Sequence, residues 1–495
     1  MRVSRASLAR GTLWNFVGQG APLLVAVFAI PELIESLGTE RFGVLVLVWM
    51  FIGYFSLFDL GIGRALTQIV ARRLVLSGDQ QISSVVWTGL LLMGLLGVAG
   101  ALLILLAAPG LVSSYLRIPD QIRDETLVSL QILALAMPAV VLTAGLAGFM
   151  AAMQRFDIIN ILRLPMGVYT FIAPWVVVQF YGDLVLISAV LAFGRIAFLF
   201  LHLVPCLVIS RELRRPRIAV GEVKPLFQFG TWLTVSNVVG PLMVYLDRFI
   251  IGMVISMSAV AYYATPYEVV TRLWIIPTAV VAVLFPAFAS LHESDLRKLA
   301  DLFDRGLRYM LLVMFPLVLT IVAFAAQGLW IWLGEEFADR STGVLRWLAI
   351  GVFVNSAAQV AFALVQGVGR PDLSAKAHLL QLPIYLGILW TLLNRFGIEG
   401  AAMAWTMRVV LDCTMLLAAV AWIDPGCRRV VRRLWPYLVG ATGLLLGLAR
   451  LHDKTFVAAA FIVLLLIFAG AAWSQLMASD EREWLLRKCE RVFNR

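Results

Sequence analysis

The stretch SVVWTGLLLMGLLGVAGALLILLA, residues 84–107, contains no charged side chain. The hydrocarbon core of a bilayer is about 30 Å thick, and a helix needs roughly 20 apolar residues to cross it. Comparable stretches recur along all 495 residues, of which 61% are apolar and 14% charged, with a mean hydropathy of +0.91. Soluble domains are typically about 45–50% apolar and about 25% charged. The composition therefore excludes a soluble protein and predicts an all-α, polytopic membrane protein.

The apolar stretches predict about fourteen membrane-spanning helices joined by short connections. The longest segments expected outside the membrane are 109–125, 210–227, 291–306 and the tail 478–495, and none has room for a soluble catalytic domain. The predicted spans cover residues 12–35, 42–63, 84–107, 127–152, 158–180, 183–209, 228–254, 258–290, 307–333, 343–368, 374–394, 399–423, 434–450 and 455–477.

Lys and Arg are distributed unequally between alternate connections, with 27 on the side of the N-terminus and 7 on the opposite side. Cytoplasmic connections of membrane proteins carry the excess of Lys and Arg. The split favours the fourteen-span order and predicts that both termini lie in the cytoplasm. The formal net charge of +10 has the same explanation, so nucleic-acid binding is not expected.

Three basic segments are expected to lie along the inner leaflet. The tail 480–495 is predicted to be a short amphipathic helix in which Trp484, Leu485 and Phe493 stand among basic residues. The connections 210–227 and 291–306 are expected to lie there as well. Their predicted role is anchoring and orientation.

An internal repeat indicates the domain organisation. Gly11-Thr12 with Pro22-Leu23-x-Val25 recurs as Gly230-Thr231 with Pro241-Leu242-x-Val244, at one constant offset. Parallel repeats of this kind build transporters whose halves rock around a central cavity. The repeat predicts an N-terminal lobe with a basic linker, a C-terminal lobe, and two accessory spans with the tail, at residues 1–226, 227–425 and 426–495.

The cysteines and histidines show no spacing typical of a disulfide or a metal site. None of the four cysteines (Cys206, Cys413, Cys427 and Cys489) is part of a CxxC pair or falls in a predicted outer segment. The four histidines are scattered. We therefore expect no metal or cofactor, apart from a coupling ion such as H⁺ or Na⁺.

Six arginines lie in or at the ends of predicted spans, where a basic side chain at mid-bilayer costs about 2.5–3.5 kcal/mol on insertion scales. Arg195 is the main functional candidate, because it lies near the middle of span 183–209 with no acid close to it in sequence. Arg346 lies one turn into its span and is expected to be an anchor. Arg408 has Asp412 one helical turn later, which predicts an ion pair.

Two neighbouring spans place two acids and two arginines at mid to outer depth. Asp247 and Arg248 are adjacent, so on a helix they do not face each other, whereas Glu268 and Arg272 are four residues apart and can pair. Arg64, at the inner end of another span, is expected either to anchor that helix at the interface or to line the inner mouth of a cavity.

Neutral polar residues form stripes on some spans. Asn15 and Gln19 share one face, Asn355 and Gln359 share another, and Tyr263 stands close to the charged pair at 268 and 272. Such residues either join helices through hydrogen bonds or line a cavity.

Four segments together carry a resemblance to a known family. They are Gly43 with Asp59-Leu-Gly-Ile-Gly-Arg-Ala-Leu66, Asp247-Arg-Phe-Ile-Ile-Gly252 with Ala259-Val-Ala-Tyr-Tyr263 and Phe285-Pro286, Gly367-Val-Gly-Arg-Pro371, and Gly397-Ile-Glu-Gly-Ala-Ala-Met-Ala404. This ordered set resembles the oligosaccharide-lipid flippases of the multidrug/oligosaccharidyl-lipid/polysaccharide exporter superfamily. The resemblance extends over nearly the full length.

The resemblance implies a V-shaped core of two six-helix lobes plus two accessory helices, working by alternating access. It also implies a cationic central cavity for the pyrophosphate and sugars of an undecaprenyl-linked oligosaccharide, such as an O-antigen, capsule or exopolysaccharide repeat unit. Polysaccharide polymerase and chain-length regulator proteins are implied as possible partners, beside the membrane lipids. The resemblance also implies a location in the bacterial cytoplasmic (inner) membrane.

The residues chosen for these roles follow from depth and pattern. Arginine suits a pyrophosphate, because its planar guanidinium can grip phosphate oxygens in a bidentate way. Arg195, Arg272, Arg248 and Arg64 are the candidate cavity cations. The candidates for a coupling or charge-balancing acid are Asp59, Asp247 and Glu268, and the candidates for the polar lining are Asn15, Gln19, Tyr263, Asn355 and Gln359.

Three alternatives stay open at this point. A drug/cation antiporter of the same superfamily usually has twelve spans and acids in its substrate lobe, whereas the spans here carry more arginine than acid. A lipid II flippase is a closer alternative than the antiporter, and the sequence does not exclude it. An integral-membrane polysaccharide polymerase or ligase is expected to need a sizeable outer loop with catalytic Arg or His, and segment 109–125 has only Arg117 and Arg123.

Overall fold

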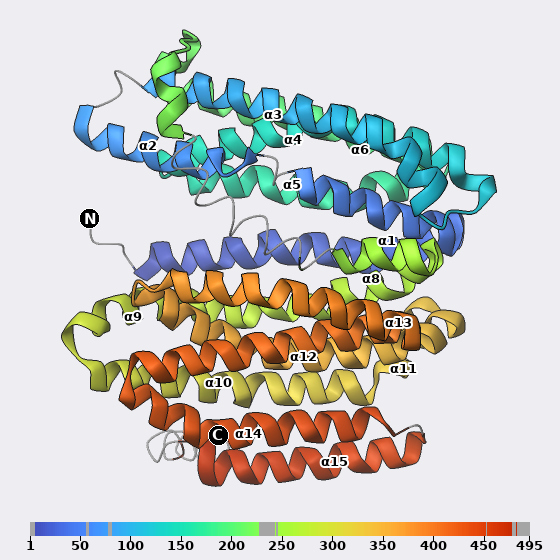
Figure 1. Ribbon diagram of the computed structural model, residues 1–495, viewed down its shortest axis with the longest axis vertical. Coiled ribbons are helices and arrows are strands. Elements are labelled where there is room, and N and C mark those ends of the chain that lie inside the picture. The colour runs from blue at the N-terminus through green and yellow to red at the C-terminus, as the bar shows by residue number, and fades with distance from the viewer. Residues whose placement is uncertain are drawn as a thin grey trace, which may run out of the picture. The chain divides into compact units, whose positions relative to one another are not determined.

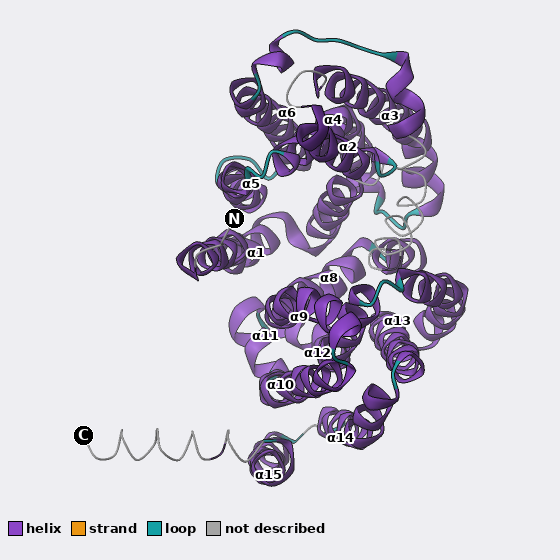
Figure 2. Cartoon of the chain, turned by 90° about the vertical axis from the view of Figure 1, so that its left-hand side faces the viewer, coloured by secondary structure: helices purple, strands orange, loops and turns teal. Residues whose placement is uncertain are grey.

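The computed structural model describes residues 5–55, 59–77, 82–226, 243, 246–451, 453–477 and 482. For residues 5–20, 54, 75–77 and 293 it describes the backbone alone. Of the described residues, 92% are helical and none forms a strand. Figure 2 shows these residues as helices and loops. The all-α prediction is thus confirmed.

Most of the described helices follow one another with short connections (Figure 1). The interval between α6 and α8 is longer and includes residues outside the described part. In chain order they are α1 (Arg5–Phe55), α2 (Ile62–Ser77), α3 (Ile82–Gly110), α4 (Asp120–Ala152), α5 (Phe156–Val178), α6 (Leu184–Ile209), α8 (Met257–Thr271), α9 (Ile275–Ser294), α10 (Leu296–Ala323), α11 (Ala325–Leu333), α12 (Glu335–Gly367), α13 (Pro371–Ile423), α14 (Pro425–Ala449) and α15 (Lys454–Ala471). Short helical turns are η2 (Leu111–Tyr115), η3 (Arg211–Arg214), η4 (Val220–Glu222), η5 (Arg272–Trp274) and η6 (Ala472–Leu476).

Ten helical segments within the described residues are long and apolar enough to cross a membrane. The protein is therefore a multi-pass membrane protein, while the count of fourteen spans is not confirmed. Two of the long helices bend at glycines that fall between predicted spans. Gly38 in α1 has φ 75° and Gly397 in α13 has φ 61°, a region of backbone space that favours glycine.

The second predicted span, 42–63, is wrong at its end. The helix α1 ends at Phe55, and a tight turn with left-handed backbone at Leu60 (φ 46°) and Gly61 (φ 74°) comes before α2. The carboxylate of Asp59 accepts hydrogen bonds from the backbone N–H groups of Gly61 (2.8 Å) and Gly63 (3.3 Å), so it caps α2. The predicted span extended into this turn because the surrounding residues are largely apolar.

The predicted connection 291–306 is largely helical, because α10 begins at Leu296. Asp295 caps α10 by accepting from the backbone N–H groups of Arg297 and Lys298, both at 3.1 Å. The hydrogen bond from the backbone of Lys298 lowers the pKa of Asp295 below its usual range. The predicted tail helix 480–495 and the repeat residues from Gly230 to Pro241 and Val244 lie outside the described residues.

The chain divides into two compact units, Met1–Ala261 and Tyr262–Arg495. In the first unit, α4 packs against α2, α3 and α6, and α1 packs against α5. In the second unit, α12 is the most buried of the candidate spans and packs against α9, α10, α11 and α13. The predicted domain limit after residue 226 borders residues outside the described part, so that division stays a prediction.

Candidate functional site

Arg195 lies inside α6, about 17 Å from the start of that helix at 1.5 Å per residue. Its Nη2 donates a hydrogen bond to Oγ1 of Thr170 on α5, at 3.2 Å. The side chain is half-buried. Among the described residues, no carboxylate lies within ion-pair distance of this guanidinium.

Tight packing of α5 against α6 fixes the surroundings of Arg195. The ring of Tyr169 lies so close to Gly194 that a Cβ there would approach it to 2.1 Å. The hydroxyl of Tyr169 donates to the carbonyl oxygen of Val190 at 2.6 Å, and the ring meets Phe198 edge-on at 6.0 Å between centroids. Thr170 and Arg195 thus lie on two helices that are packed closely together.

The other candidate charges of the first unit lie in different surroundings. Arg64 is exposed near the start of α2, close to Asp59, whose carboxylate is engaged in the cap. Asp247 and Arg248 lie in the helical segment 246–254 and are fully or almost fully buried. The Asp247 carboxylate accepts from the backbone N–H of Arg248 at 2.7 Å. In this conformation neither of these two side chains is open to a ligand.

Gly43 is one of the residues that carry the family resemblance, and close helix packing explains why a glycine stands there. A Cβ at this position would lie 1.9 Å from the carbonyl oxygen of Met257. The second half of α1 can approach the start of α8 only without a side chain there. The hydroxyl of Thr39 also donates to that of Ser258, at 3.2 Å.

In the second unit, Glu268 and Arg272 form the predicted ion pair, with Nη2 and Oε2 3.2 Å apart. Both side chains are partly exposed, at 42% and 38%. Tyr263 is fully buried and stacks on Tyr267 at 6.3 Å between centroids. Arg272 begins the turn η5, where the helix tightens before α9.

The polar stripe on α12 is internally bonded. The amide of Gln359 donates to the side-chain oxygen of Asn355 at 2.9 Å, and both residues are half-buried. Asn15 and Gln19 lie on α1, but their side chains are outside those that the structure describes. The structure does not test whether any of these four side chains lines a cavity.

The predicted ion pair between Arg408 and Asp412 is wrong, because no guanidinium nitrogen of Arg408 lies within 4 Å of a carboxylate oxygen of Asp412. The amide of Gln381 donates to Oδ1 of Asp412 at 2.9 Å, and Nε2 of His378 lies 3.5 Å from the same oxygen. These partners come from the first half of α13, which folds back at Gly397. Helix spacing alone could not have revealed them.

Arg408 therefore has other partners than the predicted Asp412. Its guanidinium lies over the rings of Tyr385 and Trp405, at 5.7 and 5.9 Å from their centroids. Its Nε is buried and has no hydrogen-bond partner within the described part of the chain. Trp405, three residues before it on the same helical face, was the available signal for this cation–π contact.

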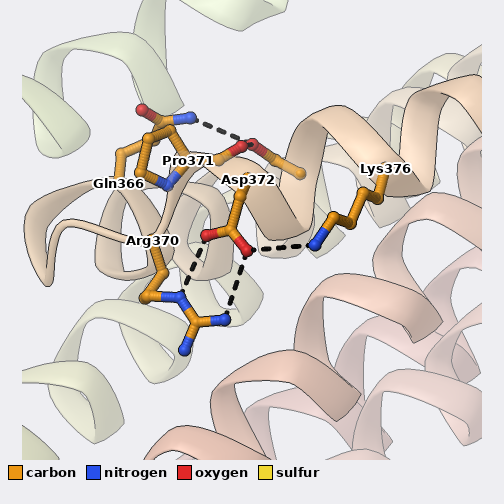
Figure 3. A network of polar contacts seen from close by, with 6 residues as sticks. Gln366, Arg370, Pro371, Asp372 and Lys376 are labelled. Carbon is orange, nitrogen blue, oxygen red and sulfur yellow. Dashed lines mark hydrogen bonds and ion pairs between the residues drawn. The ribbon is translucent and has the colours of Figure 1, made fainter.

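The segment Gly367–Pro371 forms the turn between α12 and α13 (Figure 3). The Arg370 guanidinium grips both carboxylate oxygens of Asp372, at 2.9 and 3.2 Å, and Lys376 lies 3.5 Å from the same carboxylate. The amide of Gln366 donates to Ser374 at 3.0 Å. The Gln366–Ser374 hydrogen bond therefore joins α12 to α13, and the ion pairs of Asp372 lie at the start of α13.

The fold is that of known membrane transporters. It matches the lipid II flippase MurJ in an inward closed conformation with a TM-score of 0.70 and 12% identity, over 94% of this chain and 100% of that one. It also matches an inward-facing multidrug-resistance MATE-family transporter of the MOP superfamily, with a TM-score of 0.68 and 14% identity, over 84% and 99% of the two chains. The fold thus places the chain in the class of MATE- and MurJ-like membrane proteins.

Sequence comparison narrows this class. Residues 36–342 match the family model described as polysaccharide biosynthesis protein, so the chain belongs to that family. It is 29% identical over 419 residues to the "Putative O-antigen transporter" of Shigella flexneri, covering 83% of this chain and 97% of that protein. A "Probable low-salt glycan biosynthesis flippase" of Haloferax volcanii is 24% identical over 208 residues, or 42% and 43% of the two chains.

Proposed function

We propose that this protein is a flippase that moves a lipid-linked oligosaccharide from the cytoplasmic to the outer leaflet. Membership of the polysaccharide biosynthesis family and the similarity to an O-antigen transporter over almost its whole length support this assignment. The fold alone does not separate glycan lipids from drugs, because both a lipid II flippase and a MATE transporter share it. The family match favours the glycan.

The position of Arg195 is the main structural support for binding of an anionic headgroup. A guanidinium in the middle of a membrane-spanning helix is costly unless it faces protein partners or water. Among the described residues, its hydrogen-bond partner is the neutral hydroxyl of Thr170. An anionic lipid headgroup would supply the missing countercharge. The ligand in this proposal is the diphosphate of an undecaprenyl-linked repeat unit, bound through bidentate hydrogen bonds.

The other charges have secondary roles in this proposal. Arg272, Arg248 and Arg64 would take over the headgroup as the protein alternates between inward and outward access. Glu268 would balance Arg272 when no substrate is present, in keeping with their observed ion pair. Asp247 is the further candidate for a coupling proton, whereas Asp59 caps α2. Polymerase and chain-length regulator proteins would receive the exported unit.

The test is deletion of the gene, followed by analysis of the lipid-linked sugars in each leaflet. A flippase predicts accumulation of a completed lipid-linked repeat unit that reagents outside the inner membrane cannot reach. Complementation with the intact gene should remove that pool. Accumulation of single repeat units on the outer leaflet would instead indicate a polymerase or ligase. Altered drug sensitivity with no sugar intermediate would indicate a drug exporter.

A further inference from the structure

A second cationic site lies in the first unit, away from Arg195. The connection after α6 folds against the N-terminal turn of α3 and encloses a hollow of about 470 Å³. Seven residues line the hollow, and four of them are arginines: Ser83, Ser84, Arg211, Glu212, Arg214, Arg215 and Arg217. We call this hollow the linker pocket.

The main chain around the linker pocket is fixed by α3. The hydroxyl of Ser83 donates to the carbonyl oxygen of Arg215 at 2.7 Å. The indole N–H of Trp87 donates to the carbonyl oxygen of Leu213 at 3.0 Å, and the Leu213 side chain is 2% exposed. Hence η3 is held in a defined position that presents its arginines together.

The end of the connection is tied down as well. The backbone N–H of Ala219 donates to the hydroxyl of Thr88 at 3.0 Å. Arg73 on α2 donates to both carboxylate oxygens of Glu222, at 2.9 and 2.6 Å. Together with the contacts to Leu213 and Arg215, these hydrogen bonds hold the main chain around the arginines. The pocket therefore needs little ordering before a ligand binds.

The positive charge of the linker pocket is not neutralised by described residues. None of the four arginines lies within ion-pair distance of a described carboxylate, and Glu212 is the one acid in the lining. Arg214 donates to the carbonyl oxygen of Leu207 at 3.0 Å, which leaves its terminal nitrogens available. Four guanidinium groups around one hollow are suited to a ligand with several negative oxygens.

A hollow of the second unit provides a contrast. It measures about 770 Å³ and is also lined by three arginines, Arg297, Arg429 and Arg433. Three aspartates line it too, and one of them, Asp304, is paired with Arg433. That hollow is balanced by its own acids, and the linker pocket is not.

Exposed apolar side chains next to the linker pocket favour a membrane lipid as its ligand. Ile218 is 62% exposed and Val220 is 85% exposed, directly after Arg217. Arginines followed by uncovered aliphatic side chains are typical of segments that lie at the surface of a bilayer. A lipid whose headgroup sits in the pocket would have its acyl chains beside these two residues.

We propose that the linker pocket binds the phosphate or diphosphate headgroup of a lipid in the adjacent leaflet. This site is separate from the translocation site at Arg195 and does not depend on the proposed function. The arginine forks would hold the phosphate oxygens, and Ile218 and Val220 would contact the lipid tail.

The test measures binding to the purified full chain in a neutral detergent. The probes are dioctanoyl phosphatidic acid, dioctanoyl phosphatidylcholine and inorganic diphosphate. We expect saturable binding of phosphatidic acid and at least about tenfold weaker binding of phosphatidylcholine. The double variant Arg215→Ala/Arg217→Ala should lose about tenfold in affinity for phosphatidic acid, while Lys at both positions should lose less.

The matched control is Arg428→Ala/Arg432→Ala, which removes the same charge from exposed arginines that do not line the pocket. It should bind phosphatidic acid like the unchanged protein, and equal melting temperatures would show that all variants are folded. Equal losses in the two double variants would overturn the site. The variant Ile218→Ser/Val220→Ser should weaken lipid binding alone. If diphosphate binds as tightly as the lipid and this variant changes nothing, the ligand is a free phosphate and the lipid proposal is wrong.

Discussion

Asp59 was a candidate coupling acid because of its position near the end of a predicted span, but in the structure it caps α2. Its carboxylate accepts two backbone hydrogen bonds at the start of α2. An asparagine has one acceptor oxygen, so it can keep one of these two contacts without a charge. Substitution by asparagine therefore separates the cap from a role in proton coupling.

We expect Asp59→Ala to lower the free energy of unfolding by about 1 kcal/mol, because the cap is lost. Asp59→Asn, which keeps one acceptor oxygen, should lose less stability than Asp59→Ala and should keep glycan export. Thermal unfolding of the purified protein and export in complemented cells would measure the two effects. Abolished export by a stably folded Asp59→Asn protein would assign the coupling role to this carboxylate instead.

The sequence predicted the surroundings of single residues when their partners were local. The pair Glu268–Arg272 could be predicted because four residues make one helical turn, and the structure contains it. The partners of Asp412 could not be predicted, because His378 and Gln381 come from the other half of α13. The contact of Arg195 with Thr170 was equally unpredictable, since it depends on how α5 packs against α6.

At the scale of helices, hydropathy located most elements because a span must be apolar over its whole length. Glycine bends at Gly38 and Gly397 fall within the short connections expected between spans. The turn before α2 was missed, because its residues are mostly apolar and only the Asp59 cap distinguishes them. Likewise, the fixed position of η3 depends on hydrogen bonds to α3 that leave no trace in hydropathy.

At the scale of the whole molecule, the orientation is still a prediction. The excess of Lys and Arg places the connection after α6 in the cytoplasm. Alkaline phosphatase fused after Arg217 should therefore be inactive, and a fusion after Asp453, between α14 and α15, should be active. High activity at Arg217 together with low activity at Asp453 would reverse the orientation.

The central claim is that Arg195 escorts the charged headgroup of a lipid-linked oligosaccharide across the membrane. Its direct test is translocation of a fluorescent lipid-diphosphate oligosaccharide in proteoliposomes, measured by a label-quenching reagent that cannot cross the bilayer. We predict that Arg195→Ala slows translocation at least about tenfold, which corresponds to about 1.4 kcal/mol in the barrier, and that Arg195→Lys has an intermediate rate. With equal melting temperatures for all three proteins, an unchanged rate in Arg195→Ala would contradict the claim.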